Sequence, residues 1–369
     1  TANVDRTKCD DLIPLNDKVD APLTLLDLVI NQSITISTAQ DRVFGTGNNS
    51  SSVEAHLENA LIYARELAEG DNEVSAVLDA LDGEFISPNL GGDPVRTPDA
   101  LPTGRNFYAF DQRKPPTAAA WDLGMDMVNQ TLEMHLVAHN NEYPRKMAYI
   151  LWAGETTRHE GVMEAQILYL LGVEPDWEDS DRKGKVIGVK KLSSESMNRP
   201  RIDVVIVVSG LYRDMFPEKI VLLDKAVRLA YEQNETANCP NYVKENTDAL
   251  AKALRDNDPL LNESDALNLA LFRIFGCADG TYGPGLANAI GASNTWNDTD
   301  VLAQLFIDRM GNAYGEGVWS ESATDLFTMN LADVEVTMHS RSSNLYGGID
   351  NDDFFQYPRL YKKPLSFIR

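Results

Sequence analysis

Apolar residues recur along the first part of the chain with a helical period. From Val53 to Glu69 they return every three or four positions, which is typical of an amphipathic helix. Residues 117–138 repeat this pattern, whereas residues 88–116 are dense in glycine and proline and predict ordered irregular structure. We therefore expect residues 1–142 to form a helical, loop-rich region.

The pattern of hydrophobic positions then changes, because short continuous apolar runs begin to alternate with helical patterns. Residues 147–153 and 202–209 predict buried strands, and residues 157–171 and 217–232 predict helices that follow them. Near-continuous apolar strands separated by helices are typical of a parallel sheet covered on both faces. The sequence therefore predicts an α/β fold, in which residues 143–232 form a parallel, flavodoxin-like unit.

The rest of the chain returns to helical patterns. Residues 233–340 predict a mainly helical region with a glycine-rich interruption at residues 280–285. Residues 341–369 begin acidic and end basic, which predicts an acidic segment and an aberrant or truncated C-terminus. Because the chain also starts at Thr1 without an initiator methionine, we expect an internal piece of a longer protein.

Polar side chains follow each of the two predicted buried strands. Arg158, His159 and Glu160 come after the first strand, and Arg213 and Asp214 come after the second. Ligands of parallel sheets bind beyond the carboxyl ends of the strands. The sequence therefore predicts that both polar segments lie at the same edge of the sheet.

Composition narrows the possible partners. The 369 residues, 43% of them hydrophobic, are enough for two or three domains with cores. A formal net charge of -23 repels nucleic acid and anionic membranes and attracts metal cations or a basic protein. Cys9, Cys239 and Cys277 are too widely spaced for a disulfide framework or a zinc motif, which fits a reducing compartment. No apolar run approaches the ~18 residues of a membrane span.

Several long motifs, in the right order, resemble the large subunits of cobaltochelatases and magnesium chelatases, particularly the CobN-type branch. These motifs lie at residues 81–86, 91–94, 101–111, 143–161, 199–216, 273–276, 280–286 and 338–357. The resemblance implies a tetrapyrrole-binding subunit that inserts a divalent metal while separate AAA+ subunits hydrolyse ATP. The chain itself has no G-x-x-x-x-G-K-[ST] phosphate loop. From Pro358 the sequence departs from the family pattern, and full-length members are much longer.

Metal insertion requires ligands for the ion, a base for the pyrrole protons and a surface for the ring. The resemblance therefore implies that His159 and Glu160 are catalytic and that His159 and His339 bind the metal. The residues expected to hold the ring are Arg158, Arg213, Asp214 and Tyr282.

Each of these residues also has a structural alternative. Thr157 to Glu160 has the form of a capping box. Arg213 and Asp214 could form an ion pair with each other or with Arg199 or Arg201. His339 could be an ordinary polar group, and residues 280–285 a tight turn that presents Tyr282. Glu164, one turn beyond Glu160, is expected on the solvated face of its helix.

Three functions fit this resemblance. The first is a cytoplasmic ligase that forms nitrogen–metal bonds, inserting Co2+ into a hydrogenobyrinate-type corrinoid ring in cobalamin biosynthesis, with Mg2+ or iron as alternative metals. The second is a periplasmic or membrane-associated haem dechelatase of the HmuS type, which removes iron. The third is a noncatalytic tetrapyrrole carrier. In each case we expect this fragment alone to be inactive as an enzyme.

Overall fold

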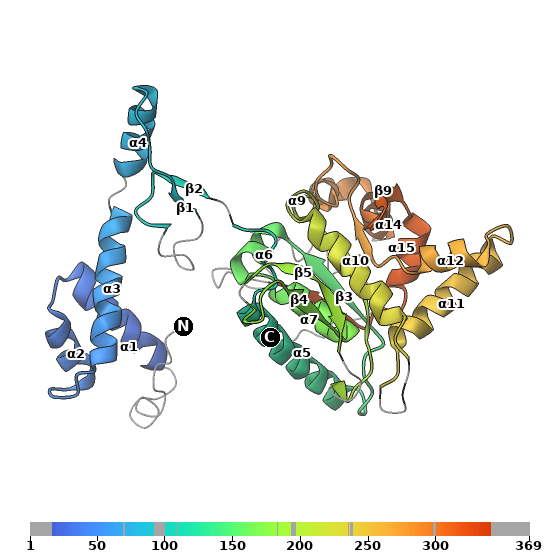
Figure 1. Cartoon of the computed structure of the whole chain (residues 1–369), viewed down its shortest axis with the longest axis horizontal. Coiled ribbons are helices and arrows are strands. Elements are labelled where there is room, and N and C mark those ends of the chain that lie inside the picture. Colours follow the sequence, from blue (N-terminus) through green and yellow to red (C-terminus); the bar gives the residue numbers. More distant parts are fainter. Residues whose placement is uncertain are drawn as a thin grey trace. The chain divides into compact units, whose positions relative to one another are not determined.

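The computed structural model describes residues 17–68, 71–91, 100–108, 110–182, 184–192, 197–234, 236, 239–297 and 300–340. The chain divides into two compact units, Thr1–Phe110 and Asp111–Arg369 (Figure 1).

The first unit is built mainly from helices. These are α1 (Asp17–Leu26), which continues into the π-helix η2 (Asp27–Asn31), α2 (Ile36–Phe44), α3 (Ser51–Ala68) and α4 (Asp71–Leu81). Helix α3 confirms the helical period seen after Val53. A small core forms where Leu28 and Val29 meet Leu57 of α3. Two short strands, β1 (Asn89–Leu90) and β2 (Asn106–Tyr108), pair in parallel.

The second unit is organised around a six-stranded sheet with the order β10-β3-β6-β7-β8-β9. The strands are β3 (Lys146–Leu151), β6 (Asp203–Val208), β7 (Ile274–Gly276), β8 (Asn312–Gly315), β9 (Val318–Ser322) and β10 (Val336–His339). Strands β10, β3, β6 and β7 run parallel, whereas β8 and β9 are antiparallel to their neighbours. The predicted α/β class with a mostly parallel sheet is confirmed. Strands β4 (Val173–Trp177) and β5 (Val186–Lys191) form a separate antiparallel pair.

Helices connect the strands of this unit. They are α5 (Ala118–Ala138), α6 (Ala153–His159), α7 (Val162–Leu171), α9 (Gly210–Met215), α10 (Pro217–Tyr231), α11 (Tyr242–Asn257), α12 (Glu263–Ala270), α13 (Leu286–Gly291), η4 (Ser293–Thr295), α14 (Asp300–Met310) and α15 (Thr324–Leu331).

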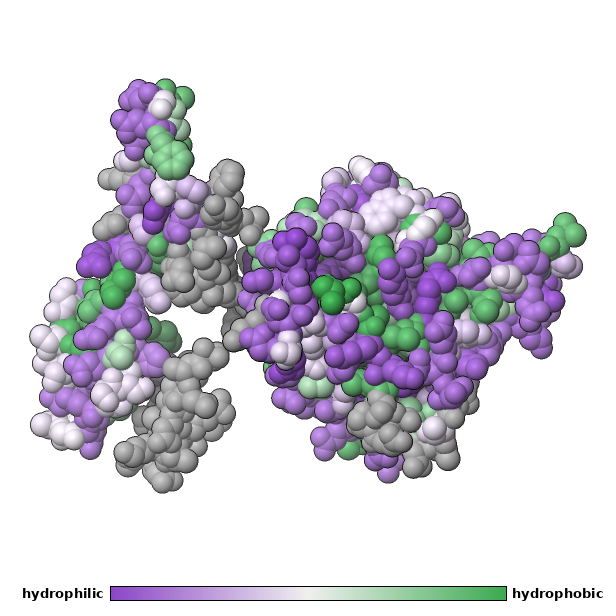
Figure 2. All heavy atoms as spheres, in the orientation of Figure 1, coloured by the Kyte–Doolittle hydropathy of each residue, from purple (hydrophilic) through white to green (hydrophobic). Residues whose placement is uncertain are grey.

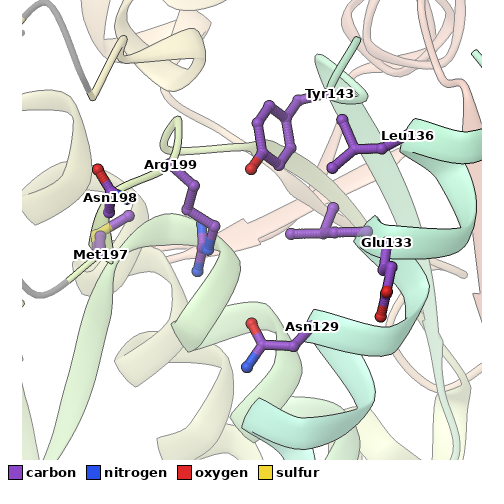
Figure 3. A pocket seen from close by; sticks show the side chains of 8 residues that line it. Asn129, Glu133, Leu136, Tyr143, Met197, Asn198 and Arg199 are labelled. Carbon is purple, nitrogen blue, oxygen red and sulfur yellow. The ribbon is translucent and has the colours of Figure 1, made fainter. Parts of the chain in front are cut away.

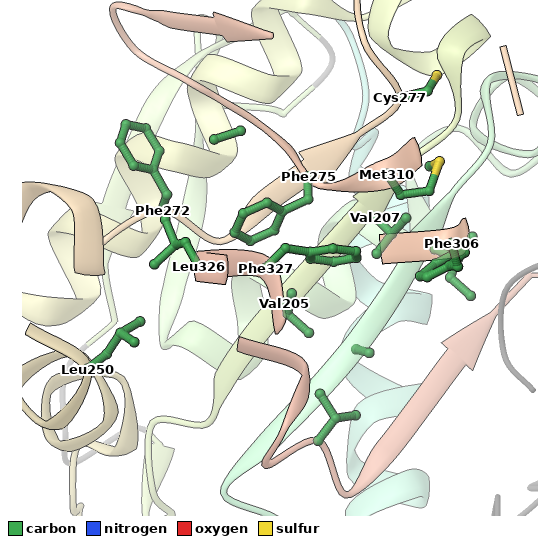
Figure 4. Close-up of a cluster of buried hydrophobic side chains, with 14 of the residues drawn as sticks. Val205, Val207, Leu250, Phe272, Phe275, Cys277, Phe306, Met310, Leu326 and Phe327 are labelled. Atoms are coloured by element: carbon green, nitrogen blue, oxygen red, sulfur yellow. The ribbon is translucent and has the colours of Figure 1, made fainter. Parts of the chain in front are cut away.

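Both faces of the sheet are buried. Alternate residues of each strand point to opposite sides, so each strand contributes side chains to both faces. Ala148 and Ile150 of β3 face a cluster that includes Phe275 and Phe327, whose ring centroids lie 4.8 Å apart (Figure 4). Helices α11, α14 and α15 contribute to this side. On the other side the hydroxyl of Tyr149 donates to the side chain of Gln166 in α7, at 3.3 Å. Helices on both faces explain why β3 and β6 are apolar throughout.

Three features of this unit differ from the sequence predictions. Helix α5 packs against α7, so it lies with the sheet and not with the N-terminal helices, although the sequence grouped it with residues 1–142. Residues 233–340 supply β7, β8, β9 and β10 as well as helices. The expected helix at residues 157–171 is two helices, α6 and α7, because Glu160 and Gly161 both have positive φ. Residues 341–369 lie outside the described residues.

Candidate functional site

The carboxyl ends of the four parallel strands, β10, β3, β6 and β7, lie at one edge of the sheet. Strands β3 and β6 pair in register from Lys146 with Asp203 to Leu151 with Val208. The N–H of Ser209 donates to the carbonyl of Leu151 at 3.0 Å, so the segments that follow both strands start side by side. Helices α6 and α9 begin there and contact each other. The polar segments after both strands therefore lie at one edge, as the sequence predicted.

His339 joins this edge from the other side of β3. It is the last residue of β10 and pairs with Ile150 of β3. Its ring centroid lies 6.3 Å from that of Trp152, the residue that precedes α6. Burial lowers the pKa of His339, and a hydrogen bond with the backbone of Ser340 and the nearby charge of Glu155 oppose the shift only in part. The imidazole is therefore neutral near pH 7, the form that can bind a metal.

Glu155 is a member of this edge that the sequence analysis did not assign. It lies in the first turn of α6, and its carboxylate accepts a hydrogen bond from Arg158 at 3.1 Å. Its charge also acts on His339. The available signal was its position directly after a buried strand, but nothing in the sequence indicated that β10 would bring a histidine to it.

His159 is held by the start of the following helix. Its Nδ1 accepts the N–H groups of Gly161 at 3.2 Å and Val162 at 3.1 Å, which caps the N-terminus of α7. The neutral ring therefore carries its proton on Nε2 and is a donor there. Binding a metal through Nε2 would require the other tautomer, and hence the loss of both capping bonds.

Glu160 connects the loop between α6 and α7 to helix α5. Its carboxylate accepts a hydrogen bond from the hydroxyl of Thr117 at 3.0 Å, and its carbonyl accepts the Thr117 N–H at 3.1 Å. The capping-box alternative is wrong, because Glu160 follows α6 in a left-handed conformation and Thr157 donates to the carbonyl of Ala153. The Glu160 carboxylate therefore helps to hold Thr117, the residue that caps the N-terminus of α5.

Arg213, Asp214 and Tyr282, three of the four residues expected to hold the ring, lie together at this edge. Nε of Arg213 donates to Asp214 at 2.7 Å, and the Tyr282 hydroxyl donates to the other Asp214 oxygen at 2.6 Å. Arg213 is 1% exposed, and its Nη1 also donates to the carbonyls of Ala278 and Thr281. The hydrogen bond from Arg213 lowers the pKa of Asp214, which is therefore ionised. Arg213 thus fixes the loop that contains Ala278 and Thr281. Tyr282, which is 62% exposed, can contact a ligand.

Glu164 was expected on a solvated face, and that expectation is wrong. It is 1% exposed, in the first turn of α7. Helix α7 is buried almost all round between α5 and the sheet, so it has no solvated face for the residue to occupy. The sequence alone could not show this, because a single glutamate in an apolar helix fits either position.

The opposite edge of the sheet carries the other charged residues of the family motifs. Arg201 donates to the carbonyls of Leu171 and Leu192 at 3.0 Å, and Arg199 donates to the carbonyl of Leu170 at 3.3 Å. Both arginines therefore satisfy carbonyl groups at the C-terminus of α7, and Arg201 also satisfies one after β5. A pocket of about 270 Å³ lies beside Arg199 and is lined largely by α5 (Figure 3).

Neither a metal cluster nor a membrane helix is found in the part of the chain that the structure describes. No three histidine, cysteine or carboxylate side chains converge there in a way that could hold an ion. None of the described helices is long and apolar enough to span a membrane. Within these residues His159 and His339 therefore do not complete a metal site.

Comparisons with known proteins agree on one family. Residues 3–358 match the family model described as CobN/Magnesium Chelatase. The chain is 32% identical over 289 residues to the aerobic cobaltochelatase subunit CobN of Sinorhizobium sp, covering 78% of this chain and 22% of that protein. It is 32% identical over 295 residues to the chloroplastic magnesium-chelatase subunit ChlH of Oryza sativa subsp. japonica, covering 79% and 20%.

A solved structure is also similar. The catalytic subunit of cobaltochelatase from Mycobacterium tuberculosis matches with a TM-score of 0.74 at 33% identity, over 93% of this chain and 28% of that one. The chain thus spans between 20% and 28% of the length of these three proteins.

Proposed function

Because the chain belongs to the CobN/magnesium chelatase family, we propose that it forms the part of a chelatase large subunit that presents a tetrapyrrole ring to a divalent metal. The observation that carries this proposal is the shared sheet edge, where His339 ends β10, Glu155 follows β3 and Tyr282 follows β7. An edge that gathers a neutral imidazole, a carboxylate and an exposed aromatic ring suits a large, flat ring and a metal cation.

The reaction assigns a task to each of these side chains. Insertion of M2+ displaces the inner N–H protons of the ring, so the site needs both an ion ligand and a proton acceptor. We assign the ligand role to His339, whose imidazole is neutral, and the acceptor role to Glu155. His159 caps α7 through Nδ1 and its Nε2 is buried, so it could reach the metal or the ring only after releasing α7.

The ring itself would be held by the exposed groups of the edge. Arg158 has a half-exposed side chain that can pair with a carboxylate arm, and Tyr282 can stack on the ring. Asp214 and Arg213 hold Tyr282 in place, and Glu160 holds the loop that carries His159.

We favour Co2+ and a corrinoid ring, in cobalamin biosynthesis in the cytoplasm. Two of the similar proteins are named cobaltochelatase subunits, and imidazole suits cobalt better than magnesium. ATP would be hydrolysed by partner AAA+ subunits, since the chain has no phosphate loop of its own.

The test is metal insertion by the full-length protein with its ATPase partners. Co2+ with a metal-free corrinoid is compared with Mg2+ and a metal-free porphyrin, and loss of iron from haem is followed separately. We expect cobalt insertion, and a reduction of about 100-fold in kcat for His339→Ala. His56→Ala, an exposed histidine of the first unit, is the control. Iron release without insertion would replace this proposal with the dechelatase, and ring binding without either reaction would replace it with a carrier.

A further inference from the structure

Glu164 connects the two helices that form the candidate site. Its Oε1 accepts the hydroxyl of Thr156 in α6 at 2.7 Å and the hydroxyl of Tyr212 in α9 at 3.0 Å. All three side chains are buried, with at most 1% exposed. A single carboxylate oxygen therefore fixes α6, which carries Glu155 and His159, relative to α9, which carries Asp214.

The second oxygen of this carboxylate is costly to bury. Glu164 Oε2 is inaccessible to solvent and has no hydrogen-bond partner among the residues that the structure describes. A buried carboxylate with an unsatisfied oxygen lowers stability. A glutamine could accept the same two hydroxyl groups through its own Oε1; its amide N–H groups would lie unpaired in the place of Oε2, but no charge would be buried. Connecting α6 to α9 therefore does not by itself require a charged side chain at position 164.

The surroundings keep both hydroxyl groups as donors to this charge. Burial raises the pKa of Tyr212 well above its ordinary value, and the charge of Glu164 raises it further, so the phenol stays protonated. Lys219 of α10 also acts on Glu164 electrostatically, but its amine donates its hydrogen bond to the carbonyl of Arg113, at 2.8 Å. No cation thus forms a salt bridge with Glu164 among the described residues.

We infer that Glu164 is a positioning residue of the chelatase site, which locks α6 to α9 and holds a negative charge behind the edge where the metal cation and the ring meet. This inference rests on the proposed function. A cation that enters the site is favoured by a fixed negative charge in a dry interior, where electrostatic interactions are weakly screened. Burying the Glu164 carboxylate then lowers the stability of the fold but favours binding of the cation.

Substitutions separate the charge from the connection. Glu164→Gln keeps an acceptor for both hydroxyl groups and removes the charge, whereas Glu164→Ala removes both. Thr156→Val and Tyr212→Phe each remove one hydrogen bond and leave the charge. Glu232→Gln, at an exposed position at the end of α10, is the control.

The measurements are thermal unfolding, insertion kinetics of the full-length protein with its partners, and hydrogen exchange of residues 153–159 and 210–215. We expect Glu164→Gln to melt at the same or a higher temperature but to lose about 10-fold in kcat with little change in KM for the ring. Glu164→Ala should lose more and should accelerate exchange in both segments. Thr156→Val and Tyr212→Phe should accelerate exchange and slow turnover to a smaller extent.

The outcomes distinguish this inference from the proposed function. If the wild-type protein does not insert a metal, the proposed function fails, and faster exchange in both segments of Glu164→Ala still supports the lock between the helices. If the wild-type protein is active and Glu164→Gln keeps its kcat within twofold, the role of the charge is overturned. A lower melting temperature with normal turnover would make Glu164 a counter-charge of Lys219 and would also overturn the inference. Should Glu164→Ala fail to fold, hydrogen exchange in Thr156→Val and Tyr212→Phe tests whether Glu164 holds α6 and α9 together.

Discussion

Buried charges lie at both edges of the sheet, and at each edge some of their polar atoms have no hydrogen-bond partner among the described residues. Where the strands begin, these atoms are Nε of Arg199 and Nε of Arg201. At the edge where the strands begin, Arg273 donates to Asp203 at 2.9 Å and Lys146 lies 3.8 Å from the same carboxylate. At the edge where the strands end, Glu164 keeps one oxygen without a partner among the described residues. A buried ion pair that satisfies all its groups serves the fold, whereas an incompletely satisfied charge is retained at a cost. Glu164 differs from the two arginines because it connects α6 and α9, the helices of the candidate site.

Lys219 provides a prediction at the scale of a single residue. It is 3% exposed, and burial lowers its pKa to about 8, although the charge of Glu164 opposes the shift. In the unfolded chain the amine titrates near ~10.4. Between these values the unfolded chain binds more protons, so the free energy of unfolding should rise with pH, by about 3 kcal/mol in total.

Lys219→Met should lack this rise. Urea unfolding of the wild-type protein and the variant at intervals from pH 7 to pH 10 measures the difference. Lys225→Met is the control, since the Lys225 side chain is half-exposed and pairs with Glu316 at the surface. Parallel pH profiles for the wild-type protein and Lys219→Met would contradict the prediction.

At the scale of elements, the strength of the local pattern decided what the sequence could predict. Strands β3 and β6 were predicted because each is six residues long and buried on both faces. Strand β7 has only three residues and β10 only four, which is too short for a periodic signal to separate them from loops. His339 was chosen as a candidate, but its place beside β3 depended on pairing between segments far apart in the chain.

The break between α6 and α7 is the element-scale feature that we expect to respond most clearly to substitution. Gly161 has a φ of +93°, and a Cβ added there would lie 2.7 Å from the Cα of Pro116 and 2.9 Å from the Cβ of Pro115. Gly161→Ala should therefore lower the free energy of unfolding by about 2–3 kcal/mol and loosen the capping of α7 by His159.

Gly154 gives the matched control for this substitution. It lies in the first turn of α6, and an added Cβ would have no atom within 4 Å. Gly154→Ala should leave stability unchanged or raise it by up to about 1 kcal/mol, because alanine favours a helix. Denaturant unfolding of both variants compares them. Equal effects would show that the turn at Gly161 adapts, and that the two helices are not fixed by this residue.

At the scale of the whole molecule, charge and exposed surface both bear on function. A formal net charge of -23 raises the local concentration of divalent cations around the chain, most strongly at low salt. Hydrophilic residues cover most of the face seen in Figure 2, yet green patches mark α4. Val74, Val77, Leu78 and Leu81 recur at helical spacing on this helix and are each more than half exposed. An apolar helix face of this kind is typical of a surface that packs against other protein in its working state.

The last prediction concerns what this chain can do alone. The similar proteins are much longer, since the chain spans only 20% to 28% of them. Within the described residues no three side chains converge as metal ligands, and the candidate edge keeps Tyr282 exposed. Enclosing a large ring and excluding water around it therefore requires more protein than the described part supplies. The isolated 369 residues should bind haem or a metal-free corrinoid weakly, and should not turn over even with ATPase partners and ATP. Absorbance titrations measure the binding, and a multiple-turnover assay beside the full-length protein measures the reaction. Sustained turnover by the isolated chain would place the whole catalytic site within it and would contradict this expectation.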